Sequence, residues 1–361
     1  MSGGNAVPEN APSVIAWETT RRCHLSCRHC RGAARNEDYA GELTIEEGMR
    51  LIDALAEMGG PILILTGGEP MSRPDIYELA RHGADSGLRV VMAPCGELLN
   101  EDTASCLKAA GVQALSISID GPDREAHDRF RGMPGAFDSA LGGIEHARNA
   151  GLRFQVNTTV TKLNAESLPE IYRLALELGA GGFDAFFLVP TGRGAALKEL
   201  ALSPDEQERA LTWLADTAVA SPIRVKATCA PQYARIIRER GGSATGGHGG
   251  HSAQGGCMAG DGFVFISHRG ILQPCGFLDV PCGDLRAGDF DFRRLYEESV
   301  VFNALRRPDD YAGRCGVCEY RVPCGGCRAR AYADCGDILG QEPACSYLPQ
   351  ALRGERACSR Q

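Results

Sequence analysis

Three cysteines near the start of the chain have a spacing that suits an iron–sulfur cluster. Cys23, Cys27 and Cys30 are separated by three and then two residues, so one tight loop can present three thiolates. A [4Fe–4S] cluster has four irons, each usually held by one cysteine. Three cysteines would leave one iron open to another ligand, as a catalytic zinc site keeps one position open. The spacing alone also allows a zinc site completed by His24 or His29.

A second motif lies at the end of the apolar run 62–65, where Gly67, Gly68 and Glu69 precede a proline. Because glycine has no side chain, two consecutive glycines let the backbone approach a ligand closely. The carboxylate of Glu69 can accept hydrogen bonds from an ammonium group. An ordinary turn between a strand and a helix needs neither feature. Together the two motifs favour an iron–sulfur cluster with a bound organic ligand over a zinc site.

Cysteine is frequent elsewhere, with sixteen cysteines in 361 residues. The sequence shows no signal peptide or membrane-spanning segment, so we expect a cytoplasmic protein, in which disulfides are rare and metal ligation is the better explanation. Nine cysteines crowd the last third of the chain: Cys257, Cys275, Cys282, Cys315, Cys318, Cys324, Cys327, Cys335 and Cys345. Four others have no close partner in sequence and are interpreted as buried or incidental thiols: Cys95, Cys106, Cys229 and Cys358.

The elements that must position these cysteines follow a repeating pattern. Short apolar runs alternate with longer segments of helical periodicity, and the runs cover residues 14–17, 62–65, 90–93, 114–119, 154–160 and 183–189. Thr44 with Glu47, and Ser203 with Glu206, form capping boxes that predict helix starts. Near-continuous apolar strands separated by helices predict a parallel sheet covered by helices. The expected fold is therefore α/β, a partial (β/α)6 barrel whose chemistry collects at the carboxyl ends of the strands.

Composition divides the chain into five parts. They are a flexible N-terminus (1–13), the barrel (14–240), a Gly/His-rich linker (241–256), a cysteine-rich cluster-binding domain (257–349) and a tail (350–361). The cysteine-rich domain has too few apolar residues for a strong core of its own, so we expect metal clusters to constrain it. The net charge of −8 argues against nucleic acid or an anionic membrane as a partner.

These motifs resemble those of the radical S-adenosylmethionine (SAM) superfamily, in which CxxxCxxC holds a [4Fe–4S] cluster and GGE binds the SAM amino group. The resemblance spans residues 14–220. It implies that seven residues contact SAM: Gly67, Gly68 and Glu69 its amino group, Ser118 its ribose, Arg131 its carboxylate, and Leu188 and Val189 its adenine. One departure is His29, since the residue before the third cysteine is often aromatic in the superfamily.

The cysteine-rich domain is similar to the SPASM-type extension of many radical SAM enzymes, which binds one or two auxiliary iron–sulfur clusters. By the matching positions, one auxiliary cluster would be held by Cys315, Cys318, Cys324 and Cys345. A second would be held by Cys257, Cys275 and Cys327, with Cys282 as a candidate fourth ligand. The extension usually has three residues where two separate Cys324 from Cys327 here. Two structural zinc sites are the alternative for this region.

Longer phrases resemble the heme b synthases of the siroheme-dependent heme pathway. They cover residues 15–20, 91–94, 156–161, 188–193, 226–231, 265–268 and 324–332. This resemblance implies that iron-coproporphyrin III loses two propionate carboxylates as CO2 and gains two vinyl groups, giving heme b. A 5′-deoxyadenosyl radical would take a hydrogen from each propionate β-carbon, and an electron donor and an electron acceptor would be needed. Four residues in or beside these phrases are candidates to hold propionates or the iron: Arg193, Lys226, Tyr233 and His268.

Two other functions are compatible with parts of this pattern. The first is a SPASM-type peptide-modifying enzyme, which commonly has a peptide-recognition domain before the first cysteine motif, whereas only 22 residues precede Cys23 here. The second is a non-catalytic iron–sulfur or zinc scaffold, in which the Gly-Gly-Glu turn would have no purpose. An auxiliary cluster beside a radical site suits a reaction that must lose an electron, and we therefore expect oxidative chemistry.

Overall fold

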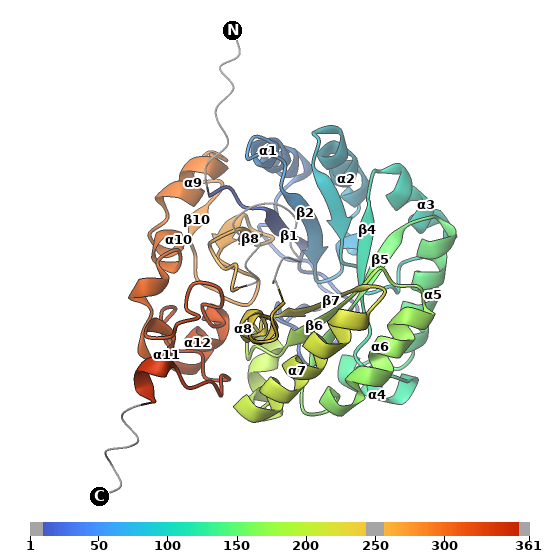
Figure 1. The fold of residues 1–361 in the computed structure, drawn as a ribbon. Helices are drawn as coiled ribbons and strands as arrows, with labels where there is room; N and C mark the ends of the chain where they lie inside the picture. Colours follow the sequence, from blue (N-terminus) through green and yellow to red (C-terminus); the bar gives the residue numbers. More distant parts are fainter. Residues whose placement is uncertain (1–9, 243–255, 354–361) are drawn as a thin grey trace, which may run out of the picture.

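The computed structural model describes residues 10–242 and 256–353. Within these ranges, ten strands form one sheet in the order β10-β9-β8-β1-β2-β3-β4-β5-β6-β7, with helices packed around it (Figure 1). Eight of these strands run parallel: β1 (Val14–Thr20), β2 (Ile62–Gly67), β3 (Arg89–Met92), β4 (Ala114–Ser118), β5 (Arg153–Val160), β6 (Gly182–Phe187), β7 (Arg224–Thr228) and β8 (Phe263–Ile266). Most of the predicted N-terminus, linker and C-terminal tail lies outside the described residues. Cys358, in the tail, also lies outside them.

Helices connect the strands of the barrel. They are α1 (Ile45–Ala56), α2 (Ile76–Asp85), α3 (Glu101–Ala109), α4 (Arg124–Arg131), α5 (Ala136–Asn149), α6 (Leu168–Glu177), α7 (Pro204–Ala220) and α8 (Gln232–Glu239). Both predicted capping boxes are confirmed. The Thr44 hydroxyl accepts from the amide of Glu47 at the start of α1, and Ser203 does the same for Glu206 at the start of α7. These caps stabilise helix ends by about 1 kcal/mol each and fix where each helix leaves the sheet.

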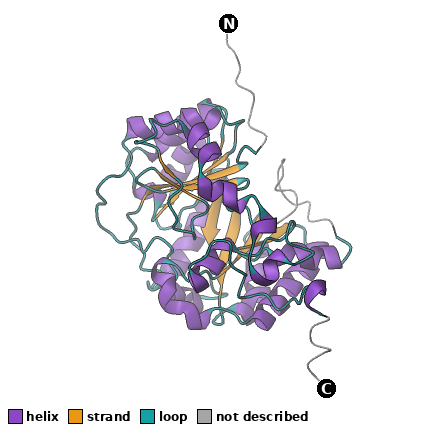
Figure 2. Cartoon of the chain, turned by 90° about the vertical axis from the view of Figure 1, so that its left-hand side faces the viewer, coloured by secondary structure: helices purple, strands orange, loops and turns teal. Residues whose placement is uncertain are grey.

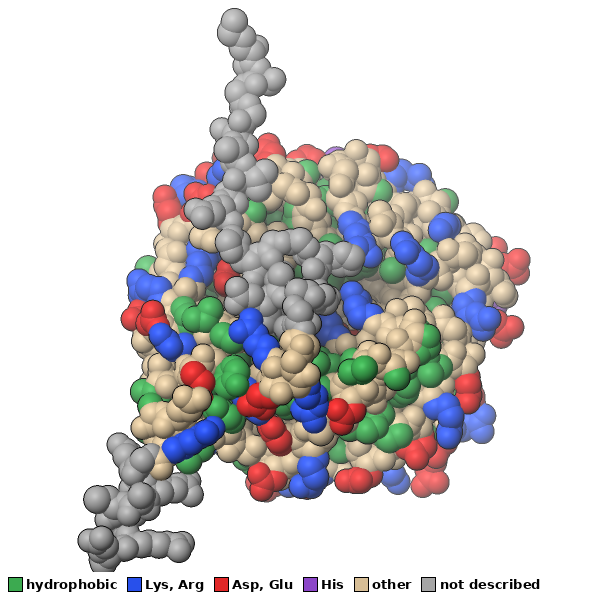
Figure 3. All heavy atoms as spheres, in the orientation of Figure 1, with side chains coloured by type: hydrophobic (Ala, Val, Ile, Leu, Met, Phe, Trp, Pro, Cys, Tyr) green, Lys and Arg blue, Asp and Glu red, His purple; other side chains and the backbone are tan. Residues whose placement is uncertain are grey.

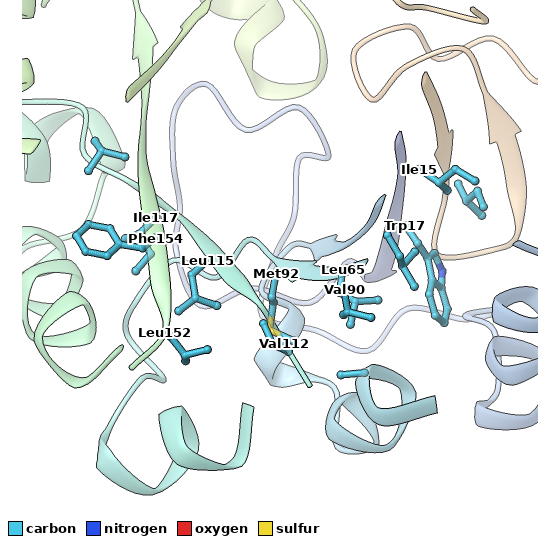
Figure 4. Close-up of a cluster of buried hydrophobic side chains, with 14 of the residues drawn as sticks. Ile15, Trp17, Leu65, Val90, Met92, Val112, Leu115, Ile117, Leu152 and Phe154 are labelled. Atoms are coloured by element: carbon cyan, nitrogen blue, oxygen red, sulfur yellow. The ribbon is translucent and has the colours of Figure 1, made fainter. Parts of the chain in front are cut away.

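The main core lies between the strands and the outer helices. Figure 4 shows part of it, with Trp17 of β1, Leu65 of β2, Met92 of β3 and Leu115 of β4 side by side. All four side chains are at most 1% exposed, and burying a side chain of this size contributes about 1.5–3 kcal/mol. The strand register starts at Val14 opposite Ile62 and aligns the carboxyl ends of β1 and β2. The partial α/β barrel predicted from the apolar runs is confirmed.

The sheet is longer than the six predicted strands. Strand β7 extends it beyond β6, with Lys226 opposite Asp184, and its alternation of polar and apolar residues gave no apolar run to recognise. Strand β8, from the cysteine-rich part of the chain, pairs with β1 on the other side, with Phe263 opposite Val14. The cysteine-rich region thus shares the sheet of the barrel, which is why it needs few apolar residues of its own.

The rest of the cysteine-rich region consists of short elements. The strands β9 (Ile271–Gln273) and β10 (Gly283–Asp284) are antiparallel to their neighbours, and the helices are α9 (Phe292–Glu298), α10 (Val300–Leu305), α11 (Gly313–Gly316) and α12 (Arg328–Cys335). Figures 1 and 2 show these elements packed beside the first strands of the barrel. No helix in the described ranges is long and apolar enough to cross a membrane.

Candidate active site

The cysteines of the first motif lie on the loop that leaves the carboxyl end of β1, called here the cysteine loop (21–35). Cys23 and Cys27 are each 7% exposed, and Cys30 is partly buried. The amide of Cys23 donates to the carbonyl of Arg35 at 3.0 Å, and the amide of Cys30 donates to the carbonyl of Cys27 at 3.2 Å. Burial raises the pKa of Cys23 to about 12, so the thiol ionises at neutral pH only beside the positive charge of a metal.

Gly67 and Gly68 allow the cysteine loop to pack directly on the end of β2. A Cβ atom on Gly67 would lie 2.3 Å from the carbonyl oxygen of Thr20, and one on Gly68 would lie 2.4 Å from that of Arg21. The amide of Gly68 donates to the Thr20 carbonyl at 2.8 Å, and the next amide, that of Glu69, donates to Arg22 at 2.7 Å. We expected these glycines to let the backbone approach a ligand closely. In the structure they let it approach the backbone that leads into the cysteines.

Glu69 is a buried carboxylate beside this loop. It is 1% exposed, and its Oε1 accepts from the amide of Met71 at 3.0 Å while Oε2 accepts from the amide of Cys95 at 2.6 Å. Burial raises the pKa of Glu69, because its negative charge has lost its hydration, and no ion pair with a Lys or Arg of residues 10–242 or 256–353 offsets that loss. An ammonium group bound here would provide a cation, as the Gly-Gly-Glu motif predicts.

Ser118 and Arg131, predicted to contact SAM, line one cleft of about 280 Å³. Leu25 of the cysteine loop lines the same cleft, as do Cys95 and Glu97 from the segment after β3. The Oε2 atom of Glu97 is buried and has no hydrogen-bond partner among the described residues. The cleft thus offers a free acceptor beside the cysteine loop, suited to a ligand that carries hydroxyl or ammonium groups.

A buried ion pair fixes Arg131 at the end of α4. Its Nε lies 2.6 Å from Oδ2 of Asp120, and its Nη1 donates to the Cys27 sulfur at 3.6 Å. Although burial opposes both charges, Arg131 lowers the pKa of Asp120, and Asp120 raises the pKa of Arg131. A permanent positive charge therefore faces the cysteine loop. The contact of Arg131 with the SAM carboxylate stays a prediction.

His29 takes the place of the aromatic residue that often precedes the third cysteine. Its ring stacks on Phe130, with ring centroids 4.5 Å apart and an interplanar angle of 12°. Burial lowers its pKa to about 4, so the ring is neutral at neutral pH. His29 thus packs as an aromatic ring would, and the alternative of His29 as a zinc ligand has no support in this geometry.

Leu188 and Val189 follow β6 and are 5% and 2% exposed. Arg330 of α12 donates through Nη2 to the carbonyl of Leu188 at 3.2 Å and to that of Cys229 at 2.8 Å. Its Nη1 lies 3.0 Å from Oε2 of Glu342, and this ion pair is buried. Side chains of the cysteine-rich region therefore hold the segment that is predicted to contact adenine.

Arg193 has a different environment from the one expected of a propionate-binding residue. Its Nε donates to the carbonyl of Cys27 at 2.8 Å and its Nη1 to the carbonyl of Ala34 at 2.5 Å, while its own amide donates to the carbonyl of Cys30 at 2.9 Å. Gly192 makes this contact possible, because a Cβ there would lie 2.1 Å from a carbonyl oxygen of the loop. Arg193 therefore holds the cysteine loop in place, and its contact with a propionate stays a prediction.

Two other candidates differ in their surroundings. The Nζ of Lys226 lies 3.0 Å from Oδ2 of the buried Asp184, and the side chain is 48% exposed, so Lys226 remains able to meet an anion. Tyr233 is packed against the main core, its hydroxyl donates to the carbonyl of Leu214 at 3.5 Å, and burial raises its pKa to about 12. The structure does not bring Tyr233 to the cleft, because its phenol faces α7.

His268 follows β8 and meets a carboxylate from β1. Its Nδ1 lies 2.7 Å from Oε2 of Glu18, and both side chains are buried. Burial opposes the charge of Glu18, but Arg31, His268 and Arg21 together lower its pKa to about 2. Because Glu18 is ionised and accepts, Nδ1 of His268 is the donor in this contact, and a carboxylate behind the ring in this way is a common partner of metal-bound histidines.

The four cysteines predicted for one auxiliary cluster lie together. Cys315, Cys318, Cys324 and Cys345 all line one hollow of about 400 Å³ in the cysteine-rich region. Arg328 donates to the Cys315 sulfur at 3.7 Å.

The other predicted group contains a cysteine that the sequence did not single out. Cys257, Cys275 and Cys327 interact electrostatically with one another, and Cys229 packs in the same small cluster of side chains. Cys282 does not join them, since it packs against the main core, and its thiol donates to the carbonyl of Val280 at 3.4 Å.

None of the described thiols, imidazoles and carboxylates converge in threes on a single metal-ion position. The thiolates of a [4Fe–4S] cluster bind separate irons and do not converge on one point. The relevant test is therefore whether the thiols surround one common volume. The three thiols of the cysteine loop pack in one cluster of side chains, and four thiols line one hollow, so both groups meet it.

Comparisons with known proteins decide the family. Residues 17–175 match the radical SAM superfamily. A protein from Methanosarcina barkeri (strain Fusaro / DSM 804) named AdoMet-dependent heme synthase is 50% identical over 345 residues, which are 94% of this chain and 98% of that protein. This chain belongs to the AdoMet-dependent heme synthase family. As a radical SAM enzyme of the heme synthase family, it uses a [4Fe–4S] cluster and SAM, and the cysteine loop with the cleft beside it fits both.

Two more distant similarities agree with this membership. A second Methanosarcina barkeri protein, named Fe-coproporphyrin III synthase, is 32% identical over 351 residues, covering 93% of this chain and 88% of that protein. The crystal structure of Streptococcus suis SuiB bound to S-adenosylmethionine has a TM-score of 0.72 at 15% identity and covers 94% of this chain and 78% of that chain. This second likeness shows that the heme synthase family member shares the fold of that enzyme.

Sequence reasoning missed several residues of this heme synthase family site. Cys229 had no neighbouring cysteine in sequence, and Glu18, Arg330 and Glu342 are charged residues whose partners lie far along the chain. One signal was available for Glu18, because an acid within the apolar strand β1 needs a buried partner.

Proposed function

We propose that this chain converts iron-coproporphyrin III into heme b by oxidative decarboxylation of two propionate side chains to vinyl groups. The observation that carries the proposal is the 50% identity to a protein named heme synthase over nearly the full length of both chains. A relative named for iron-coproporphyrin III, at 32% identity, supports the same class of tetrapyrrole.

In this proposal, the residues of the cleft bind and orient the cofactors. Cys23, Cys27 and Cys30 would hold the cluster, Glu69 the SAM amino group and Arg131 the SAM carboxylate. When bound, the cluster and SAM supply a 5′-deoxyadenosyl radical that can abstract a hydrogen atom. Arg131 keeps its charge because it is paired with Asp120 in a buried site, so a carboxylate in the cleft meets a fixed cation.

The substrate needs cations for its propionates and a ligand or neighbour for its iron. Figure 3 shows Lys and Arg side chains bordering a hollow in one face of the molecule, although the chain as a whole has a net charge of −8. Lys226 is half exposed beside Asp184 and can pair with a propionate. His268 has the carboxylate partner typical of metal-bound histidines, and we assign it as the candidate axial ligand.

The overall conversion fixes what else must be present. Each propionate becomes a vinyl group by losing CO2, one hydrogen atom and one electron. An electron acceptor is therefore required in addition to the reductant that starts the reaction. Cys315, Cys318, Cys324 and Cys345 would hold an auxiliary cluster suited to that acceptor role, and Arg235 places a positive charge near Cys345 and Cys318.

The test is an anaerobic assay of the reconstituted full chain with SAM, a reductant and iron-coproporphyrin III. We expect at least about eight irons per chain, from two four-iron clusters, and heme b as the product by mass spectrometry. Cys27→Ala should abolish SAM cleavage, whereas Cys318→Ala should retain SAM cleavage and lose heme formation. Formation of 5′-deoxyadenosine with no mono- or di-decarboxylated porphyrin would refute the substrate and leave the radical SAM chemistry intact.

A further inference from the structure

Cys229 lies where the last barrel strand meets the cysteine-rich region. It is the residue after β7 (Arg224–Thr228), so its backbone belongs to the barrel and not to the region that contains the other auxiliary cysteines. It is partly buried and packs with Cys257, Cys275 and Cys327 in one small cluster of side chains. Four thiols from four separate places in the chain thus share one site.

The thiols of this group are close enough to interact. Cys327 is buried, and Cys229, Cys257 and Cys275 pack against the same small group of side chains that contains it. Cys275 in turn interacts with Cys257 and Cys327. Four cysteines gathered from separate elements at one site are the ligand number that a [4Fe–4S] cluster requires. A polynuclear metal site neutralises the charges of all of the thiolates.

The backbone at Cys229 is held in a conformation that costs energy. Its φ is +58°, in the left-handed region that a non-glycine residue adopts only at an energetic cost. The carbonyl of Cys229 accepts from Nη2 of Arg330 at 2.8 Å, and Arg330 is paired with Glu342. The same carboxylate accepts from the amide of Cys327 at 2.8 Å. One buried ion pair therefore fixes the backbone at both Cys229 and Cys327.

We propose that Cys229 is the fourth cysteine ligand of the second auxiliary iron–sulfur cluster, together with Cys257, Cys275 and Cys327. Cys282, the candidate expected from the sequence, is excluded by its position, since its thiol contacts the Val280 carbonyl and the Ser299 side chain. This cluster then has a cysteine on every iron and no open position for a substrate. The assignment goes beyond the proposed function and stands whether or not the substrate is a porphyrin.

The test compares Cys229→Ala with Cys282→Ala in the reconstituted full-length chain. Both remove a partly buried thiol, so they match in the type of change. We expect Cys229→Ala to lose at least one iron per chain, or to convert one cluster to a three-iron form seen by EPR and Mössbauer spectroscopy. Cys282→Ala should keep the iron content and both spectra of the unchanged protein.

A third variant separates ligation from a structural role. The serine oxygen can bind iron, so Cys229→Ser should retain more iron than Cys229→Ala but shift the EPR signal of one cluster. Circular dichroism and SAM binding show whether each variant is folded. Wild-type iron content and spectra in folded Cys229→Ala would overturn the assignment, and so would an equal or larger loss of iron in Cys282→Ala. If Cys229→Ala does not fold, an EPR spectrum of Cys229→Ser that matches the unchanged protein overturns it.

Discussion

The guanidinium Nη1 of Arg330 lies 3.0 Å from Oε2 of Glu342, and the two side chains are 6% and 0% exposed. Through the same two side chains, the carbonyls of Leu188 and Cys229 in the barrel are joined to the amide of Cys327 in the cysteine-rich region. This ion pair therefore links the two parts of the chain at the place where the predicted adenine contact and the proposed cluster ligands lie.

Breaking this buried pair should be costly. We expect Arg330→Met to lower the free energy of unfolding by about 3–5 kcal/mol, because it leaves the Glu342 charge buried without a partner. The double variant Arg330→Met with Glu342→Leu should be more stable than Arg330→Met alone. Denaturant unfolding of the metal-free chain measures both. As a control, Lys198→Ala removes an exposed pair with Asp334 and should change stability by no more than about 0.5 kcal/mol. A Lys198→Ala effect as large as that of Arg330→Met would contradict the account.

Arg193 should matter for the cysteine loop and not for substrate affinity. Arg193→Met removes two hydrogen bonds to loop carbonyls, each worth about 1 kcal/mol. We expect SAM cleavage to fall about tenfold or more, equally with and without porphyrin, as measured by 5′-deoxyadenosine formation. Arg129→Met, at an exposed arginine of α4, is the control and should have no effect. Normal cleavage with a raised KM for porphyrin would instead identify Arg193 as a propionate ligand.

Gly192 and Gly135 form a matched pair for testing how tightly the cysteine loop is packed. Both have positive φ, +56° and +83°, but a Cβ on Gly192 would meet the Arg31 carbonyl at 2.1 Å, whereas one on Gly135 meets nothing within 4 Å. Gly135→Ala should cost about 1 kcal/mol of unfolding free energy, from backbone conformation alone. Gly192→Ala should cost at least twice as much and reduce the iron retained by the first cluster. Equal costs by thermal unfolding would show that the loop is not packed in this way.

His127 predicts a dependence of stability on pH. Burial, followed by repulsion from Arg131, lowers the pKa of His127 from 6.5 to about 4. In the folded chain its Nδ1 accepts from the amide of Asp120. The unfolded chain therefore binds a proton more readily than the folded chain. The contribution is complete above pH 6.5, declines as the pH falls toward 4, and amounts to at most about 3 kcal/mol.

The variant His127→Asn isolates this contribution. Its amide oxygen keeps an acceptor near the Asp120 amide but does not titrate. Between pH 6.5 and 4 the variant should lose less unfolding free energy than the unchanged chain, measured by denaturant titration at each pH. Identical losses would show that His127 does not contribute.

Local sequence patterns predicted those parts of the site whose position depends only on neighbouring residues. Cys23, Cys27 and Cys30 lie on one loop, and Glu69 on the next strand end, because spacing and the strand-to-loop position depend on neighbouring residues only. Strand β7 was missed because an edge strand with Lys226 facing outward has no apolar run. The expected separation of barrel and cysteine-rich region was also too simple, since β8 pairs with β1 across about 250 residues of sequence.

Other features of the site depend on pairings at long range. The thiols that pack in one cluster with Cys229 are contributed by other elements, and the hydrogen-bond partners of Arg193 lie 159 and 166 residues away, so local sequence gives neither environment. Tyr233 was placed beside the site by its sequence phrase, yet the helix α8 turns its phenol toward α7. Spacing in the sequence identifies residues that could act together. Only the packing of the folded chain determines which of them are in contact.

The most direct test of the central claim follows one hydrogen atom. Iron-coproporphyrin III carrying deuterium at the propionate β-carbons is incubated anaerobically with the reconstituted chain, SAM and reductant, and both products are analysed by mass spectrometry. The account predicts deuterium in 5′-deoxyadenosine, together with heme b that has lost two molecules of CO2. Unlabelled 5′-deoxyadenosine with the porphyrin unchanged would contradict it.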